Sequence, residues 1–355
     1  MPTTYAIPDG RTVMAATLYA ANGSTQTISN AVNGVSMQPD FVWVKSRQYT
    51  TVGHSLFDAL RPIGVNSSLP RLVSNSTDAE TNNGGLTAFV SNGFSLNNDA
   101  YINSTSTGGN MVAWQWNAGG STVTNTSGTI SAQVRANATA GFSVVTYTGN
   151  GTSGATVGHG LGVAPAMMII KLRNSTENWP VYHKNQNASP ANGCTYLSLT
   201  NAYAAFTGIF NNTVPTSSVF TLGNHAQTNG NTNTYVAYCF AAVAGYSAFG
   251  SYTGNGSTDG PFIYTGFRPR FVMVKSSTVV VNWLVYDTAR DAYNVMNAEL
   301  FPNTSGAEVT ASTNDFDFLS NGFKCRRGGT ISNQNGETYI YMAFGENPFK
   351  YANAR

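Results

Sequence analysis

Charged residues are scarce in this sequence. They make up 10% of its 355 residues, against roughly 25% in ordinary globular domains. With 18 basic and 16 acidic residues the formal net charge is +2, so the chain lacks the clustered positive charge by which proteins bind nucleic acid. Its one basic cluster, Lys324 with Arg326 and Arg327, is interpreted as the charged end of an edge strand.

Cysteine and long apolar runs are also rare. Cys194, Cys239 and Cys325 are far apart and form no CxxC pair. The sequence therefore supports neither a zinc motif nor a disulfide scaffold. No apolar run approaches the roughly 20 residues of a membrane-spanning helix. The start, MPTTYAIPDG, lacks the features of a signal peptide. We therefore expect no membrane insertion.

Aromatic and small polar residues are abundant instead. The chain holds 19 Phe, 18 Tyr and 5 Trp, whereas disordered chains contain few aromatics. Short runs of Val, Ile, Phe, Tyr and Thr recur between Gly, Asn and Ser residues, as is typical of strands and turns. No long stretch shows the apolar spacing of an amphipathic helix. These patterns predict an all-β protein.

A repeat is visible in the pentapeptide YTGNG, which occurs at 147–151 and 252–256, with the looser YAANG at 19–23. Other strings align with it: PDFVWVK, PAMMIIK and PRFVMVK begin at 39, 165 and 269, and MVAWQW, YVAYCF and YIYMAF begin at 111, 235 and 339. From the second copy to the third these strings all move by 104 or 105 residues. Independent strings at one constant offset indicate a threefold tandem repeat.

Each repeat, at about 105 residues, has the size of an autonomous domain. We name residues 1–117 unit one, 141–245 unit two and 246–355 unit three, and interpret 118–140 as a Gly/Ser/Thr-rich linker able to form an extra strand. Each unit is expected to be a β-sandwich of jelly-roll or lectin-like type, with an open barrel as the alternative. Units two and three are joined directly and should pack rigidly, while unit one should sit more independently.

Candidate catalytic groups are few. His54 and Asp58 are four residues apart and could form an acid–base pair, but the position of Asp58 holds His183 in unit two and Asp287 in unit three. Such variation favours a polar strand end over a catalytic base, which needs partners within hydrogen-bond reach. We expect no enzymatic activity, no catalytic residue and no cofactor.

Two further sets of charged residues are interpreted structurally. Lys45, Lys171 and Lys275 end the same strand in the three units, and we expect each stem to cover apolar surface while the ammonium reaches water. Asp315 and Asp317 alternate with phenylalanines and supply too few oxygen ligands for calcium. We therefore expect no metal site.

The stretches between the shared strands differ in length and content, and variable loops on a repeated scaffold are the usual place for recognition. Tyr101, Tyr203 and Phe206 are aromatics in such loops and are the predicted ligand-binding residues. An aromatic face beside Asn and Ser suits a sugar, through stacking and hydrogen bonds. The alternative is that these side chains pin their loops to the sandwich.

Several specific strings carry a family resemblance: GFSVVTYTGNG, VGHGLGVAP, TGFRPRFVMVK, the SNGF turns and the C-terminal YIYMAFGENPFKYANAR. With these, nearly the whole chain resembles a repeat domain of unknown function met in virion proteins of tailed bacteriophages, many of them marine or freshwater. The resemblance implies a structural protein in or near tail fibres and other surface appendages. It brings no catalytic residues.

The expected function is that of a non-enzymatic virion protein, a tail fibre or fibre-like appendage, made in the host cytoplasm and exposed on the particle. Its partners would be other virion proteins, further copies of itself and a host-surface glycan, since avidity compensates for weak sugar binding. A capsid decoration or cement protein without a host ligand is the alternative. A glycan-cleaving enzyme would need paired carboxylates, for which the repeats offer no consistent position.

Overall fold

The computed structural model describes residues 4–64, 67–106, 109–310 and 313–348. Strands account for 41% of the chain and helix for 3%, which confirms the all-β prediction. The helical elements are single turns, such as η1 (Gly10–Thr12), η3 (Pro190–Asn192) and α1 (Ala226–Asn229).

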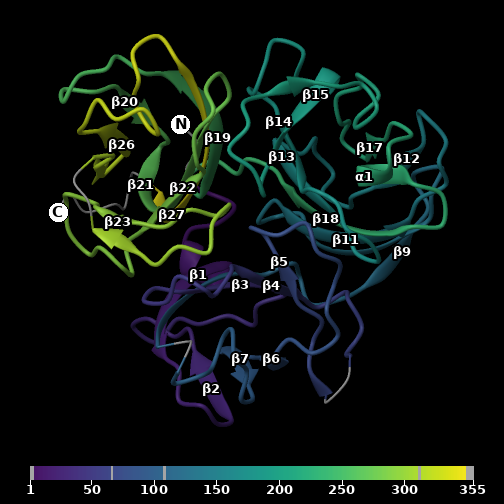
Figure 1. Cartoon of the computed structure of the whole chain (residues 1–355), viewed down its shortest axis with the longest axis horizontal. Coiled ribbons are helices and arrows are strands. Elements are labelled where there is room, and N and C mark those ends of the chain that lie inside the picture. The colour runs from purple at the N-terminus through teal and green to yellow at the C-terminus, as the bar shows by residue number, and fades with distance from the viewer. Residues whose placement is uncertain (1–3, 65–66, 107–108, 311–312, 349–355) are drawn as a thin grey trace.

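Three antiparallel sheets are arranged around a common centre (Figure 1). The first has the order β1-β8-β3-β4-β5, with β1 (Met14–Ala20), β8 (Asn110–Trp116), β3 (Phe41–Ser46), β4 (Ser55–Asp58) and β5 (Leu72–Val73). The second has the order β16-β15-β14-β13-β18-β11-β10-β9, with β16 (Ala204–Ala205), β15 (Gly193–Tyr196), β14 (Pro180–His183), β13 (Met167–Leu172), β18 (Thr234–Phe240), β11 (Phe142–Thr148), β10 (Ala132–Asn137) and β9 (Val123–Asn125). The third has the order β19-β27-β21-β22, with β19 (Ser247–Thr253), β27 (Thr338–Pro348), β21 (Phe267–Ser276) and β22 (Leu284–Asp287).

The three sheets share a pairing scheme. In each, the last long strand of the unit lies between the first strand and the strand that carries the buried lysine. The first and last strands pair at Met14↔Trp116, Phe142↔Phe240 and Ser247↔Phe344. Strands so enclosed are apolar on consecutive positions because both of their faces are covered. The proposed domain boundaries remain a prediction.

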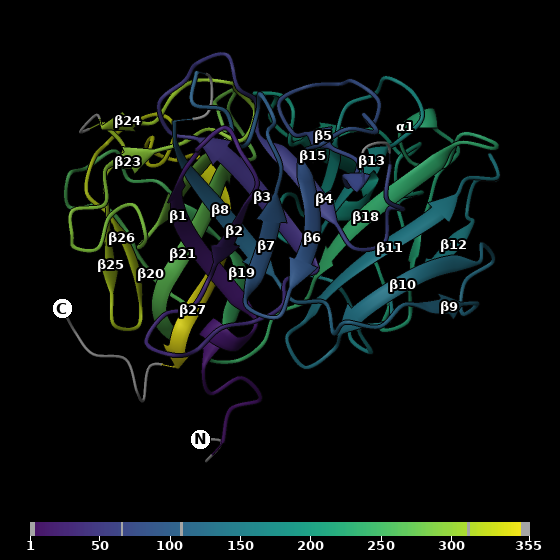
Figure 2. The same ribbon diagram turned by 90° about the horizontal axis from the view of Figure 1, so that it is seen from below.

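A smaller sheet covers the outer face of each main sheet (Figure 2). The small sheets are β2 (Gln26–Ser29), β7 (Gly93–Leu96) and β6 (Leu86–Val90) in unit one, β12 (Thr156–Gly158) and β17 (Val219–Thr221) in unit two, and β20 (Phe262–Tyr264), β26 (Gly322–Cys325) and β25 (Phe316–Leu319) in unit three. Each encloses a separate apolar cluster between the two layers, as in a β-sandwich. Two short strands, β23 (Ala298–Glu299) and β24 (Val309–Thr310), pair beside β22.

The segment between units one and two is structured. Strand β10 pairs along its whole length with β11, and β9 pairs with β10. This segment, which the sequence predicts to be a linker able to form an extra strand, contributes two strands to the second sheet.

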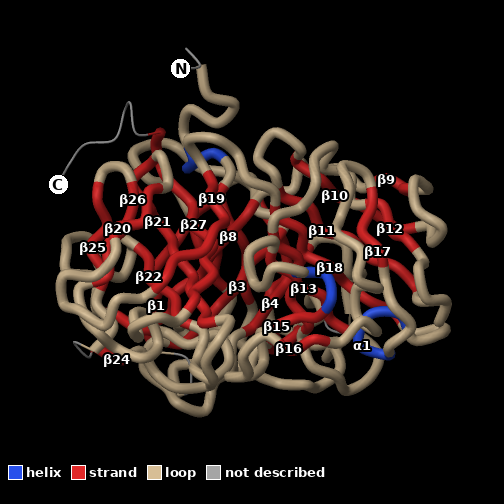
Figure 3. The backbone as a smooth tube through the Cα atoms, turned by 90° about the horizontal axis from the view of Figure 1, so that it is seen from above, coloured by secondary structure: helices blue, strands red, loops and turns tan. Residues whose placement is uncertain are grey.

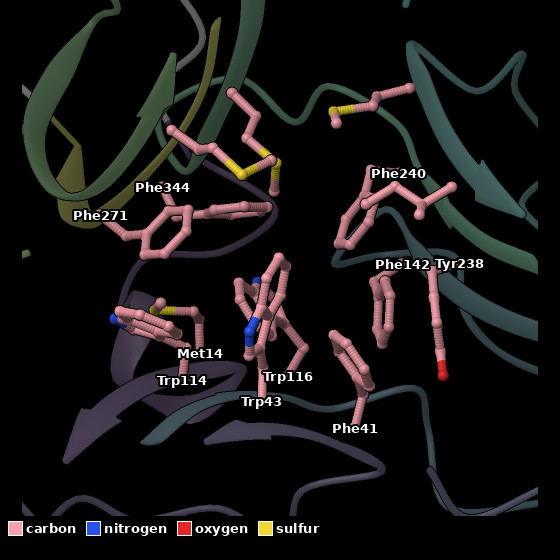
Figure 4. Close-up of a cluster of buried hydrophobic side chains, with 14 of the residues drawn as sticks. Met14, Phe41, Trp43, Trp114, Trp116, Phe142, Tyr238, Phe240, Phe271 and Phe344 are labelled. Carbon is pink, nitrogen blue, oxygen red and sulfur yellow. The ribbon is translucent and has the colours of Figure 1, made fainter. Parts of the chain in front are cut away.

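A fourth apolar cluster lies between the three main sheets (Figure 4). Trp116 of unit one is at its centre and is 1% exposed. Its ring centroid lies within 5.5 to 6.4 Å of five phenylalanine rings from all three units, Phe41, Phe142, Phe240, Phe271 and Phe344. The expectation that unit one sits more independently is wrong, because its inner face completes this shared core.

The two ends of the described chain lie on the same side of the molecule (Figures 2 and 3). Helical turn η1 packs against β27, and Gly10 touches the Gly345 carbonyl so closely that a Cβ would clash with it. This contact joins unit one to unit three, so the three units form a closed ring.

Candidate functional site

Tyr101, a predicted ligand-binding residue, is held in place on the surface of unit one. Its ring is 37% exposed, and the Arg71 guanidinium lies 3.7 Å from the ring centroid. Its backbone N–H donates to Asp99 Oδ1 at 2.8 Å. One ring face is therefore occupied by the guanidinium, an arrangement stabilised by cation–π attraction.

Tyr203 and Phe206 flank β16 in unit two. The Tyr203 hydroxyl donates to the Ser189 carbonyl at 3.0 Å, and its backbone N–H donates to the Ser277 carbonyl of unit three at 2.9 Å. Phe206 is 43% exposed and packs edge-on against His225. Tyr203 thus pins its loop to a neighbouring unit, Phe206 offers an exposed ring, and Tyr101 lies apart from both in unit one. A ligand-binding role for the three remains a prediction.

His54 and Asp58 are bound to partners other than each other. His54 is buried and its Nδ1 accepts from Trp43 Nε1 at 2.9 Å; burial, with the charge of a nearby lysine, holds the pKa of His54 well below its usual range. Asp58 accepts from Arg61 Nε at 2.6 Å and from the Tyr238 hydroxyl at 2.8 Å. These contacts give both side chains structural roles in the assembly.

Asp58 begins a line of charges that connects units one and two. Arg61 Nη1 lies 3.0 Å from Glu80 Oε2, and the same oxygen lies 3.0 Å from Arg173 Nε of unit two. Because both guanidiniums are at least four-fifths buried, removing either carboxylate would leave a cation without its partner in a poorly solvated site.

An equivalent line connects units three and one through Asp287, Arg290, Glu308 and Arg47. Between units two and three, His183 stands where the other units have aspartate. Its Nδ1 accepts from a backbone N–H, so Nε2 carries the proton and donates to the Tyr341 carbonyl at 3.1 Å.

The three strand-end lysines are fully buried, so the expectation that their ammonium groups reach water is wrong. Lys45 Nζ donates to the Ser46 carbonyl at 2.8 Å, and Lys275 Nζ donates to the Ser276 carbonyl at 2.7 Å. Lys171 Nζ instead reaches across to unit one. The following loop and the neighbouring unit cover each strand end. Burial lowers the pKa of Lys45 and of Lys171 to about 8, and it lowers the pKa of Lys275 to about 7.

The basic cluster of unit three is also placed differently from the expectation. Lys324 lies on β26, the central strand of its sheet, not on an edge. Each cation of the cluster faces a carboxylate: Lys324 faces Asp259, Arg326 faces Asp317 at 3.4 Å, and Arg327 faces Asp315 at 2.9 Å. The basic cluster therefore pairs with the acidic residues of the NDFDF segment, Asp315 and Asp317, although the two segments are separate in the sequence.

These pairs border a polar cavity of about 440 Å³. Its lining residues are Thr258, Asp259, Val295, Asp315, Arg326 and Arg327. Asp315 is 3% exposed; its Oδ2 accepts from Arg327, while its Oδ1 has no hydrogen-bond partner among the described residues. A buried acceptor without a donor is costly, and here it belongs to a residue that lines a cavity.

A second buried acid lies behind Asp315. Glu299 is 2% exposed and accepts from the Tyr286 hydroxyl and the Asn314 side chain. Burial raises the pKa of Glu299, and the charge of Asp315 adds to that rise. The carboxylates that line the cavity itself are those of Asp259 and Asp315, while Arg326 and Arg327 supply donors.

Within the part of the chain that the structure describes, no group of three or more His, Cys, Asp or Glu is arranged to hold a metal ion. Over the same residues, no helix is long and apolar enough to cross a membrane. The residues that line the polar cavity supply hydrogen-bond donors and acceptors.

One protein-family model, described as a domain of unknown function (DUF7483), matches residues 10–348. The chain belongs to the DUF7483 family. The DUF7483 match runs through units one, two and three together. No curated protein and no solved structure matches this chain.

Only some of the residues that line the cavity could be singled out from the sequence. Asp315, Arg326 and Arg327 stand out as charged residues, but Thr258, Asp259 and Val295 lie in segments with no distinguishing pattern. Thr258 and Asp259 come before β20, and Val295 comes before Met296, which bridges to Phe316 of β25. Sheet pairing brings these segments together, which the periodicity of a single strand cannot reveal.

Proposed function

We propose that this chain is a non-enzymatic structural protein of a bacteriophage particle, a tail fibre or fibre-like appendage, which presents a rigid surface to a glycan of the host cell. The resemblance of its repeated strings to phage virion domains supports the virion assignment. The shared core supports rigidity, because Trp116 packs against rings of all three units.

The contrast between a matched scaffold and an unmatched surface carries the proposal. The first and last strands of the three main sheets pair in one scheme, whereas the charged pairs of unit three have no match in unit one. Counted from the SNGF turns, the places of Asp317 and Arg327 hold Ala88 and Asn98 in unit one. Differences at the surface of a repeated scaffold are typical of recognition.

Labelling of intact particles tests the virion assignment. Particles of the encoding phage would be purified, their proteins identified by mass spectrometry, and an antibody against this chain located by electron microscopy. Label on the tail or its fibres is the expected result. A chain absent from purified particles would contradict the proposal.

The same experiment distinguishes a second candidate function, that of a capsid decoration or cement protein without a host ligand. The closed ring supports this candidate as well, because a rigid body with matched inner packing suits a fixed place on a lattice. Label on the head would favour decoration.

Native mass spectrometry of the purified chain would show whether it forms the proposed homo-oligomer.

A further inference from the structure

The outer face of the small sheet in unit three carries exposed aromatic side chains. Along β20 the side chains alternate, with Ile263 in the sandwich core and its neighbours outside. Phe262 is 45% exposed and Tyr264 is 63% exposed. On the same face Lys324 and Asp317 lie in one cross-strand row with Phe262. Two rings therefore stand beside a row of charged groups.

Unit one shows that the fold does not require these rings. The matching positions of β2 hold Thr27 and Ser29, which are exposed, while Ile28 between them is buried. Ser95 takes the place of Lys324, and its hydroxyl lies 3.0 Å from that of Thr27. Small hydroxyl side chains are thus sufficient on this face of the scaffold.

Unit two shows the same face covered. The matching positions of β12 hold Thr156 and Gly158. The linker packs over them: the Thr129 N–H donates to Thr156 Oγ1 at 2.9 Å, and Asn125 lies so close to Gly158 that a Cβ there would clash with its side chain. Of the three equivalent faces, that of unit three combines exposure with aromatic side chains.

The aromatic face is continuous with the polar cavity. Lys324 pairs with Asp259 and Asp317 pairs with Arg326, and both Asp259 and Arg326 line the cavity. In Figure 2, β20, β26 and β25 lie on the outside of their lobe, and the exposed rings of Phe262 and Tyr264 leave this face open to an extended ligand.

The charges of this surface indicate the kind of ligand. Three cations face three carboxylates, so the surface has no excess charge to attract a nucleic acid or another polyanion. Paired guanidiniums and carboxylates present donors and acceptors at fixed positions, and exposed rings offer flat apolar faces. An uncharged sugar matches both features, because its hydroxyls donate and accept while its C–H face packs on aromatic rings.

We propose that the outer face of unit three binds an uncharged oligosaccharide. One sugar ring packs on Phe262 and Tyr264, and a neighbouring ring enters the cavity, where its hydroxyls donate to Asp315 and accept from Arg326 and Arg327. This inference rests on the proposed function, since it names the surface and the ligand class through which the appendage recognises a host.

The test uses a variant copied from unit one. Phe262→Thr combined with Tyr264→Ser places the unit-one residues on β20, so the scaffold is expected to fold. The full chain, this variant and Asp315→Asn would be applied to an array of neutral oligosaccharides of glucose, galactose, mannose and N-acetylglucosamine, followed by calorimetric titration. We expect the double variant to bind at least tenfold more weakly and Asp315→Asn to bind several-fold more weakly.

The matched control is Val123→Thr, which removes exposed apolar surface from β9, where Val123 is 57% exposed. The affinity of this variant for the oligosaccharide should equal that of the unaltered chain. Circular dichroism and thermal melting would establish that each variant is folded. If Tyr101→Ala or Phe206→Ala abolishes binding while the double variant retains it, glycan recognition stands and the unit-three site is wrong. Binding to no neutral oligosaccharide, or to anionic ones alone, would overturn this inference, whereas particle labelling decides the virion assignment independently.

Discussion

Trp114 of unit one donates its indole Nε1–H to Asp287 Oδ2 of unit three at 2.9 Å, and both side chains are buried. The same carboxylate oxygen accepts from Arg290 Nε at 2.6 Å. Tyr238 of unit two makes the corresponding contact with Asp58 of unit one. Buried polar contacts thus help to align neighbouring units, in addition to the apolar packing at the centre.

Replacement of Asp287 by alanine should strongly destabilise the protein. The change leaves Arg290 and the Trp114 N–H buried with an incomplete set of partners, and breaking a buried ion pair in this way costs about 3–5 kcal/mol. Denaturant unfolding would measure the loss in the free energy of unfolding. Arg326→Ala, which removes a half-exposed partner of Asp317, should cost less than about 1 kcal/mol. Equal losses in the two variants would contradict the role given to Asp287.

Replacement of Trp116 by alanine tests the shared core. We expect a loss of about 3–5 kcal/mol, the usual cost of removing a buried large aromatic ring. Because the ring contacts all three units, hydrogen exchange should accelerate in β3, β11 and β21 together. Acceleration confined to unit one would show that the units are energetically separate.

The free energy of unfolding should rise between pH 7 and pH 9. Burial lowers the pKa of Lys275 to about 7, while in the unfolded chain a lysine titrates near 10.4. Below pH 7 both states hold the proton, and the native state carries the full cost of a buried charge. Above pH 7 only the unfolded state holds it, so stability increases by up to about 1.4 kcal/mol per pH unit. Lys45 and Lys171, with a pKa of about 8, add to the rise above pH 8.

Urea titrations at several pH values would measure this rise. Lys275→Met should reduce it, because the group that changes protonation is gone. Lys184→Met, a change at an exposed lysine of unit two, should leave the slope as it is. A profile that is flat for the unaltered chain would refute the prediction.

The three cysteines should be unreactive in the native protein. Cys194, Cys239 and Cys325 are buried free thiols, and burial raises the pKa of each to about 12. Since the thiolate is the reactive form, a thiol reagent such as dithionitrobenzoate should label fewer than one thiol per chain before denaturation and three after it. Rapid labelling of the native chain would contradict the burial of these strands.

The sequence predicted the strands and turns well, because their signals are local. The glycine of each Asn-Gly pair after the first strands favours a left-handed conformation, and Gly151 and Gly256 have φ of 70° and 67°. Apolar runs such as FVWV indicate burial on both faces. A single sequence does not reveal what covers those faces, so the shared core escaped prediction.

The candidate site was harder to predict because its residues meet only through sheet pairing. Arg326 and Arg327 were identified as basic residues, but the carboxylates facing them lie on other strands. Phe262 and Tyr264 look like ordinary strand residues until Thr27 and Ser29 are seen at the equivalent places. Exposure of an aromatic ring depends on which side of the strand faces the core, and pairing register determines that side.

The closed ring has a consequence for synthesis on the ribosome. The central core needs Phe344 on β27, the last strand of the chain, to pack against Trp116 of unit one. Translation delivers unit one first and then unit two, whose Phe142 and Phe240 cover part of its inner face, so that face stays incompletely covered until translation is almost complete. Uncovered apolar surface in a nascent chain promotes aggregation. Efficient production of this protein should therefore depend on chaperones that shield unit one until release.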